Sequence, residues 1–170
     1  MKKIFLTFFF LIFSSIAYGE EKIVYLDINF LLSQSEVGKY VNSNLKKIND
    51  KNNEEFKKIE LSIKSSEEKL IKQKNILKKE DYEIKFSDLK NKFKSYQEQR
   101  KKKNAELTEL RNKAGNEILK HINEILTKYS QSESISLIIE KKNVVIGKTD
   151  LDVTSDILSL LNKKIKKIEL

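Results

Sequence analysis

The sequence predicts an α+β fold, mostly α, in which a long antiparallel helical hairpin projects from a small body of short β-strands. A lysine-rich stretch, residues 41–129, contains no proline and one glycine, Gly115. Apolar residues recur along it at alternating steps of four and three, which is the seam pattern of a two-helix coiled coil. Short segments rich in β-branched residues flank it on both sides. They resemble two halves of one small body, and this argues against the competing interpretation, a single uninterrupted rod.

The apolar seam divides into two arms with a charged turn between them. The run Lys78–Asp81 is the most charged point near the middle, so the turn is expected near residues 78–82. Each arm of roughly 40 residues would reach ~60 Å at 1.5 Å per residue. The expected seam residues are Val41, Leu45, Ile48, Phe56, Ile59, Ile63, Leu70 and Leu77, then Tyr82, Phe86, Leu89, Phe93, Tyr96, Leu107, Leu110 and Ala114. Polar residues interrupt the seam at Asn52, Ser66, Arg100 and Lys103, where the helices are expected to pair weakly.

Residues 1–19 have the pattern of a Sec-type secretory signal. Two lysines precede an apolar run, residues 4–13, and small residues occupy the positions that a signal peptidase reads, Ala17 and Gly19. Cleavage is expected before Glu20; an uncleaved anchor is the alternative, although the apolar run is too short to span a bilayer. The mature chain is therefore expected to be exported and soluble, in the periplasm if the source is a double-membrane bacterium.

Composition excludes several chemistries. The chain has 170 residues, a formal net charge of +9 and no cysteine. It therefore has no disulfide framework, thiol nucleophile or thiolate metal site. Loss of Lys2 and Lys3 lowers the basic count from 34 to 32 against 25 acidic residues, so the mature charge is +7.

The remaining segments are expected to form the body, from residues 20–40 together with 130–170. Asp27 is placed to cap a short helix, and Asp152 or Thr154 to start a last one. The helical period stops after Tyr129, and the serine-rich residues that follow resemble a break between arm and body.

Three short strands are predicted in the body, at residues 22–26, 135–139 and 144–146, with residues 140–143 as the turn of a β-hairpin. Three isolated strands are marginally stable, so their apolar faces are expected to be buried by self-association. The candidate residues of the oligomer core are Ile23, Tyr25, Leu137, Ile138, Ile139, Val144 and Ile146.

Three groups of residues near the two chain ends follow a recognisable order. They are Ile23–Asp27 with Leu31, Leu32 and Ser35–Lys39; Leu137–Lys141 with Val144–Gly147; and Asp152–Thr154 with Ile157 and Leu158. Together they resemble the opening strand and aspartate, the closing β-hairpin and the Asp-Ile-Thr helix start of the Skp/OmpH family of periplasmic chaperones. The resemblance covers the whole chain, from signal to last helix.

This resemblance implies a jellyfish-like homotrimer. Strands from three subunits would form the body, and three helical hairpins would surround a cavity that holds unfolded outer-membrane β-barrel proteins without nucleotide. It also implies contact with anionic lipid or lipopolysaccharide. The hairpin sequence diverges in such families, so no individual contact residue is carried over.

The sequence offers few groups for catalysis, and no enzyme activity or cofactor is predicted. His121 is the only histidine, and it shares a helix face with Glu117 and Glu124, which is common on solvated helices. Capping and turn roles account for Asp27, Asp150 and Asp152 better than a metal site does. The four glycines form no phosphate-binding loop.

Lysines gather on both sides of the expected turn. One interpretation is the solvated face of a long helix pair; the other is an electropositive tip that attracts acidic polypeptides or anionic head groups. The aromatic residues Tyr82, Phe86, Phe93 and Tyr96 are expected to pack in the seam, with contact to apolar segments of a bound protein as the open alternative. The candidate contact lysines are Lys72, Lys74, Lys78, Lys79, Lys85, Lys90, Lys92 and Lys94.

The sequence is compatible with three functions. The first is an ATP-independent holdase that shields the exposed strand edges and apolar residues of unfolded barrel proteins. The second is a structural coiled-coil spacer or adaptor of the cell envelope, which gives no reason for the paired β segments. The third is nucleic-acid binding, suggested by the basic charge alone and opposed by export.

Overall fold

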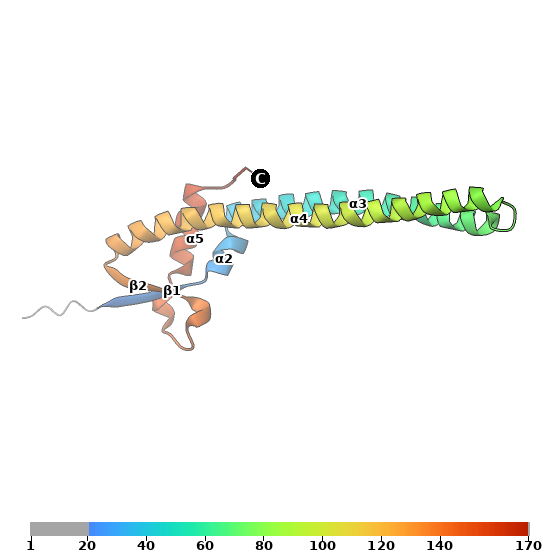
Figure 1. Cartoon of the computed structure of the whole chain (residues 1–170). Coiled ribbons are helices and arrows are strands. Elements are labelled where there is room, and N and C mark those ends of the chain that lie inside the picture. The colour runs from blue at the N-terminus through green and yellow to red at the C-terminus, as the bar shows by residue number, and fades with distance from the viewer. Residues whose placement is uncertain (1–20, 170) are drawn as a thin grey trace, which may run out of the picture.

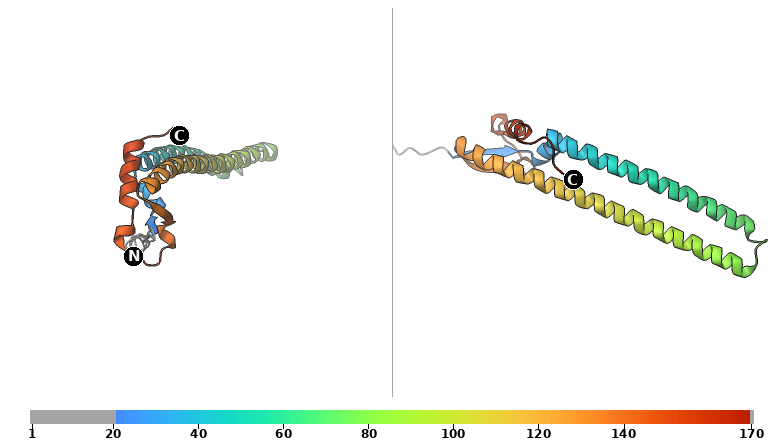
Figure 2. Two further views of the ribbon diagram at one scale, coloured as in Figure 1. Left: turned by 90° about the vertical axis from the view of Figure 1, so that its left-hand side faces the viewer. Right: turned by 90° about the horizontal axis from the view of Figure 1, so that it is seen from above.

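The computed structural model of the chain describes residues 21–169, so the predicted signal, residues 1–19, lies outside the described part. The chain forms β1 (Lys22–Leu26), α2 (Ile28–Gln34), α3 (Glu36–Gln73), α4 (Lys79–Ser132), β2 (Ile135–Glu140), the 3-10 turns η1 (Lys141–Asn143) and η2 (Thr149–Leu151), and α5 (Thr154–Lys164). A small body lies at one end, and α3 and α4 project from it as one long arm (Figures 1 and 2).

The arm turns back on itself slightly earlier than the sequence suggested. The chain leaves helix α3 after Gln73 and enters α4 at Lys79, so the turn occupies residues 74–78 rather than 78–82. The charged run begins α4 because Glu80 and Asp81 stand in its first turn, where acidic side chains interact favourably with the helix dipole. Helix α4 then returns alongside α3 to the body (Figure 2).

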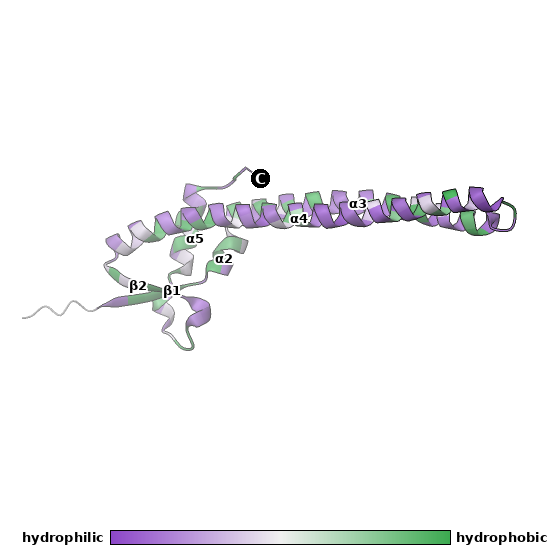
Figure 3. Cartoon of the chain, in the orientation of Figure 1, coloured by the Kyte–Doolittle hydropathy of each residue, from purple (hydrophilic) through white to green (hydrophobic). Residues whose placement is uncertain are grey.

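The seam between α3 and α4 is well packed near the body and thin farther out. Val41, Leu45 and Ala114 are buried near the body, whereas Phe86 is 54% exposed and Phe93 48% exposed near the turn. Two helices cover only a narrow stripe of each other, and these two phenylalanines lie at the edge of that stripe instead of inside it. Figure 3 shows the arm as mainly hydrophilic with isolated apolar positions.

The expected interruption at Arg100 is filled by a small polar and aromatic cluster. Phe56 and Tyr96 are buried against each other, with ring centroids 6.0 Å apart. The Tyr96 hydroxyl donates a hydrogen bond to Glu60, and Arg100 Nη1 donates one to the Tyr96 oxygen at 2.9 Å. The Arg100 guanidinium also lies 5.8 Å from the Phe56 ring centroid. The expectation of weak pairing here is therefore wrong at Arg100, because this long side chain lies over the aromatic pair and bonds to it.

The two strands are parallel neighbours. Ile23 pairs with Leu137, Val24 with Ile138 and Tyr25 with Ile139, the two strands coming from opposite ends of the long helical pair. Parallel strands require a long crossover connection, which α2, α3 and α4 supply. Ser134, with φ of 52°, reverses the chain between α4 and β2.

The expected third strand and closing β-hairpin are absent from the described chain. Residues 141–143 form η1, and residues 144–146 belong to no strand. Within this chain the second edge of β1 is taken by a single bridge from Tyr25 to Asp152, and the Val153 N–H donates to the Tyr25 carbonyl at 3.0 Å. Residues 144–146 therefore have no strand to pair with here.

Tyr25 holds the loop between β2 and α5. Its hydroxyl donates to the Lys148 carbonyl at 3.0 Å, and Lys141 Nζ lies 6.0 Å from its ring centroid. A Cβ atom added to Gly147 would stand 2.7 Å from the Tyr25 ring, so only glycine lets the loop pass this close. The loop is thus packed on a side chain of β1.

The body core joins both chain ends to the last turns of α4. Fully buried apolar side chains come from β1, α2, α3, α4 and α5, namely Val24, Leu26, Leu31, Val37, Ile118, Ile122, Ile157 and Leu161. Helix α4 continues through residues 130–132, which the sequence pattern assigned to a break, because its last turns cover this core. Tyr129 donates to Asp156 Oδ2 on α5 at 3.0 Å, and burial together with this bond raises the pKa of Tyr129 to about 12.

We predict opposite effects for two glycine-to-alanine changes in the helices. A Cβ atom at Gly38 would stand 2.0 Å from the Leu32 carbonyl oxygen, so Gly38→Ala should lower the free energy of unfolding by about 1–3 kcal/mol or more. Nothing lies within 4 Å of a Cβ atom at Gly115, so Gly115→Ala should raise it by about 0.5–1 kcal/mol. Urea unfolding followed by circular dichroism checks both. Equal effects of the two changes would contradict the close approach of α2 and α3.

Candidate functional surfaces

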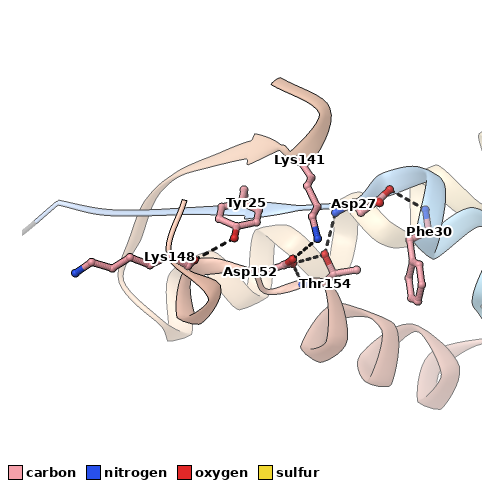
Figure 4. Close-up of polar contacts among 7 residues, drawn as sticks. All are labelled: Tyr25, Asp27, Phe30, Lys141, Lys148, Asp152 and Thr154. Carbon is pink, nitrogen blue, oxygen red and sulfur yellow. Dashed lines mark hydrogen bonds and ion pairs between the residues drawn. The ribbon is translucent and has the colours of Figure 1, made fainter. Parts of the chain in front are cut away.

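A polar junction joins the first strand to the last helix (Figure 4). The Asp27 N–H donates to Thr154 Oγ1 at 2.9 Å, and the Thr154 hydroxyl donates in turn to Asp152. The carboxylate of Asp27 caps α2 by accepting from the Phe30 N–H at 2.8 Å, as predicted. The aspartate and the Asp-Val-Thr segment that suggested the family resemblance therefore meet in space, and their role is to close the body.

Lys141 completes this junction from η1. Its Nζ donates to Asp152 Oδ2 at 2.7 Å, and the Thr154 N–H donates to Asp152 Oδ1 at 3.0 Å. Burial alone would raise the pKa of the Asp152 carboxyl, but the hydrogen bonds from Lys141 and Thr154 outweigh it and lower that pKa. The ionised form of Asp152 is thus the form that stabilises the fold.

The three aspartates that were considered as metal ligands are not grouped at one site. Asp27 and Asp152 belong to the junction, whereas Asp150 is exposed in η2. Across residues 21–169, no three His, Asp or Glu side chains are grouped closely enough to hold a metal ion. His121 Nε2 lies 3.5 Å from Glu117 Oε1, and its Nδ1 is buried without a hydrogen-bond partner in the described chain.

The strand pair presents an apolar outer face. Side chains alternate along a strand, and Val24 and Leu26 point into the core, so Ile23 and Tyr25 point away from it. By the strand register, Leu137 and Ile139 lie beside them on the same outer face. Ile23 is 43% exposed and Leu137 51% exposed. Four of the candidate oligomer-core residues therefore lie on the same outer face, where Ile23 and Leu137 are exposed and Tyr25 is partly covered by the loop at Gly147.

The other three candidates have different positions. Ile138 pairs with Val24 on the inner face and packs against the body core of its own chain, so it is not free for contact with another subunit. Val144 is half-buried near Gly147. Ile146 is almost fully exposed, and so is Val145, which is not among the predicted residues. A run of three β-branched residues was the signal that should have included Val145.

The candidate lysines surround the far end of the arm and are all exposed. Lys72 is on α3, Lys74 and Lys78 are in the turn, and the remaining five are on α4. Lys85 Nζ donates to Gln73 Oε1 at 2.9 Å across the helix pair. Lys94 Nζ lies 4.0 Å from Glu98 Oε1, an exposed pair of little strength.

A shallow hollow of about 280 Å³ lies between the helices near the turn. Lys69, Lys85 and Lys92 line it, with Asp88 as the acidic member; the remaining lining residues are Ser66, Leu70, Gln73 and Leu89. Lys69 was not among the sequence candidates, because only the pairing of α3 with α4 places it beside Lys85. The hollow has a net positive charge and suits an anionic group.

Lysines and phenylalanines occupy different flanks of the α4 seam. Lys85 and Lys92 are seven residues apart, as are Phe86 and Phe93, so each pair lies on one line along the helix. The two lines are about 100° apart around the helix axis, since 3.6 residues make a turn. Phe86 stacks on Tyr82, with ring centroids 6.4 Å apart, which leaves an aromatic flank open to solvent.

No helix within residues 21–169 is long and apolar enough to cross a membrane.

Comparisons with known proteins agree with this architecture. A family model described as outer membrane protein (OmpH-like) matches residues 22–161. Among solved structures, the chain is similar to a crystal structure of a candidate outer membrane chaperone (OmpH-like) from Caulobacter crescentus CB15. That match has a TM-score of 0.80 and 18% sequence identity, and it covers 89% of this chain and 90% of the other. No curated protein matches the sequence.

The polar junction should make the free energy of unfolding depend on pH. Asp152→Ala removes the acceptor for Thr154 and the partner of Lys141, so it should lower the free energy of unfolding at pH 7 by about 1–3 kcal/mol. The pKa of Asp152 is lowered in the folded chain, so its contribution is present above the ordinary value of 3.8 and is lost as the pH falls through the folded pKa. Urea unfolding at a series of pH values from 7 to below 3.8, at one protein concentration, measures this loss. The exposed Asp150→Ala is the control, and equal effects would contradict the assignment.

Proposed function

The chain belongs to the OmpH-like family of outer membrane proteins, and we propose that it is an ATP-independent holdase that binds unfolded outer-membrane β-barrel proteins and prevents their aggregation. The observation that carries the proposal is the two-sided arm, which presents phenylalanines and lysines to solvent far from the body. Unfolded barrel proteins expose apolar side chains and unpaired strand edges. Many weak contacts along such an arm suit reversible holding.

We place the working protein in the periplasm as a homotrimer. The predicted signal and the family both support export. The outer face of the strand pair and the exposed Val145 and Ile146 support self-association, because contiguous apolar surface on a small body is usually covered. Three bodies joined in this way would direct three arms around a common cavity, in which a bound chain is hidden sterically.

The two flanks of the arm would act at different stages of capture. Lysines at the tip would attract acidic stretches of a client over about a Debye length, roughly 10 Å at 0.1 M salt. Phe86 and Phe93 would then contact apolar segments of the captured client, which removes apolar surface from water. No catalytic step or cofactor is part of this proposal.

The hollow lined by Lys69, Lys85 and Lys92 supports a secondary proposal of contact with anionic lipid or lipopolysaccharide head groups. Such contact would place the arm near a membrane surface, where barrel proteins are inserted. The alternative function, a structural spacer of the cell envelope, would use the same arm but would not need exposed phenylalanines.

The holding role predicts that the wild type suppresses aggregation of an outer-membrane barrel protein diluted from urea. Phe86→Ser with Phe93→Ser should weaken this suppression, whereas Ile84→Ser should not, because Ile84 is exposed but lies more than a third of a turn from the phenylalanine flank. Light scattering during dilution measures the effect. A properly assembled wild type that leaves scattering unchanged would refute the holdase proposal and favour the spacer.

Assembly should depend on the exposed segment after β2. Val145→Asp with Ile146→Asp should dissociate the trimer, since burial of an unpaired charge in a subunit contact is costly, and the fold should persist because both side chains are exposed. Sedimentation equilibrium reports the mass, and circular dichroism reports the fold. Asn143→Asp is the control with a neighbouring exposed charge. Ile138→Asp is unsuitable because it would disturb the core. A monomeric wild type at micromolar concentration would remove the proposed architecture.

Client capture should weaken with salt, mainly through the tip lysines. Changing Lys72, Lys74, Lys78 and Lys79 to Glu should slow association with an acidic client at low salt, with a smaller change in dissociation. The matched control changes four exposed lysines of α3 nearer the body, Lys46, Lys47, Lys57 and Lys58, and alters the net charge equally. Stopped-flow capture of a labelled unfolded barrel protein gives both rates. Equal association rates for the two variants would assign the tip lysines to a merely solvated face.

A further inference from the structure

The residues after α5 lie across the first turns of α3. We call residues 165–169 the strap. Helix α5 ends at Lys164, and Ile165 is extended with φ of −148° and ψ of 136°. Figures 1 and 2 show this end of the described chain lying beside the start of α3. The strap therefore connects the body helix α5 to the root of the arm.

Polar contacts join the strap and the end of α5 to one side of α3. The Glu36 N–H, one of the free donors at the start of α3, donates to Asn162 Oδ1 at 2.8 Å. Lys166 Nζ lies 3.2 Å from Glu36 Oε2, and Lys167 Nζ lies 5.6 Å from the centroid of the Tyr40 ring. Glu36 and Tyr40 are four residues apart and share one helix face. Successive strap residues thus bind successive turns of α3.

Apolar contacts accompany these bonds. Ile165 and Ile168 are partly buried and pack against the body core, as does Tyr40. The strap is therefore seated on the molecule by its isoleucines and aligned by its lysines. The two isoleucines flank the two adjacent lysines in the order Ile165, Lys166, Lys167, Ile168.

The two long helices are anchored to the body differently. Helix α4 reaches the body core with Ile118, Ile122 and Ile125, in the C-terminal part of the helix. Helix α3 begins at a bend, where Ser35 ends α2 and caps α3 through the Gly38 N–H. Its inner side is buried at Val37 and Val41, and its other side is held by the strap. The charged groups of that contact are about half exposed or more, so salt weakens it.

We propose that the strap is a releasable clamp on the root of α3, which locks the first turns of the arm to the body and lets them loosen when its ion pair is screened or broken. Loosening would occur at the bend between α2 and α3. In a chaperone that holds clients between arms, this clamp would tune how far the arms open; that consequence alone rests on the proposed function.

Hydrogen exchange of residues 36–41 in the full chain without client, followed by mass spectrometry, tests the clamp. Lys166→Glu should speed exchange by up to about fivefold at low salt, the range of an exposed ion pair. Combining it with Glu36→Lys should restore protection. The neighbouring exposed Lys163→Glu changes the charge equally and should exchange like the wild type. A chain ending at Lys164 should exchange at least as fast as Lys166→Glu.

Salt provides the second measurement. Wild-type exchange of residues 36–41 should approach that of Lys166→Glu at 1 M salt, where the screening length is about 3 Å. If residues 36–41 exchange as slowly in both Lys166→Glu and the shortened chain as they do in the wild type, the proposal is overturned. Faster exchange in Lys163→Glu as well would assign the effect to general charge and also overturn it. Because no client is present, either result leaves the holdase proposal unaffected.

Discussion

The parallel pairing of β1 with β2 is the constraint on which the rest of the structure depends. The two strands lie at opposite ends of the long helical pair in the sequence and must run in the same direction, so the chain has to return to the side of the body where β1 begins. Helix α4, with 54 residues, is accordingly longer than α3, with 38. The additional turns pass beside the strand pair and bury Ile118, Ile122 and Ile125 in the body core. Helix α4 therefore belongs to both the arm and the body.

The polar junction and the body core together hold α5 against β1. Thr154 receives the N–H that follows β1 and donates to Asp152, so the last helix is placed against the first strand by hydrogen bonds. The same closure leaves part of the outer side of the strand pair uncovered, with Ile23 and Leu137 half exposed, whereas the loop after β2 packs on Tyr25. A chain of this size with most of its length in a two-helix arm has little apolar surface left to cover that face itself. This uncovered surface is the physical basis for the proposal of self-association.

The arm differs from the body in how it is stabilised. Its root is packed by apolar residues, its middle by the cluster of Phe56, Glu60, Tyr96 and Arg100, and its far end by few buried side chains. Elements with few buried contacts open locally at low cost in free energy. Thin packing also leaves phenylalanines and lysines exposed on separate flanks. The thin packing that weakens the far arm as a folded structure is thus also the basis for the proposed contacts with client proteins.

The sequence by itself determined the long helical pair, the first cap at Asp27, the two real strands and the family resemblance, because each depends on periodicity or on neighbours a few residues away. It did not determine that β1 and β2 are parallel, that residues 144–146 form no strand within the chain, or that Ile138 faces inward. Those outcomes depend on which distant segments meet, and strand propensity is the same for every partner and either direction. The turn was misplaced by a few residues because a charged run suits a helix start as well as a loop. The separation of Lys85 from Phe86 into two flanks follows from helix geometry, but only the packing of α3 on α4 decided which flanks remain in contact with solvent.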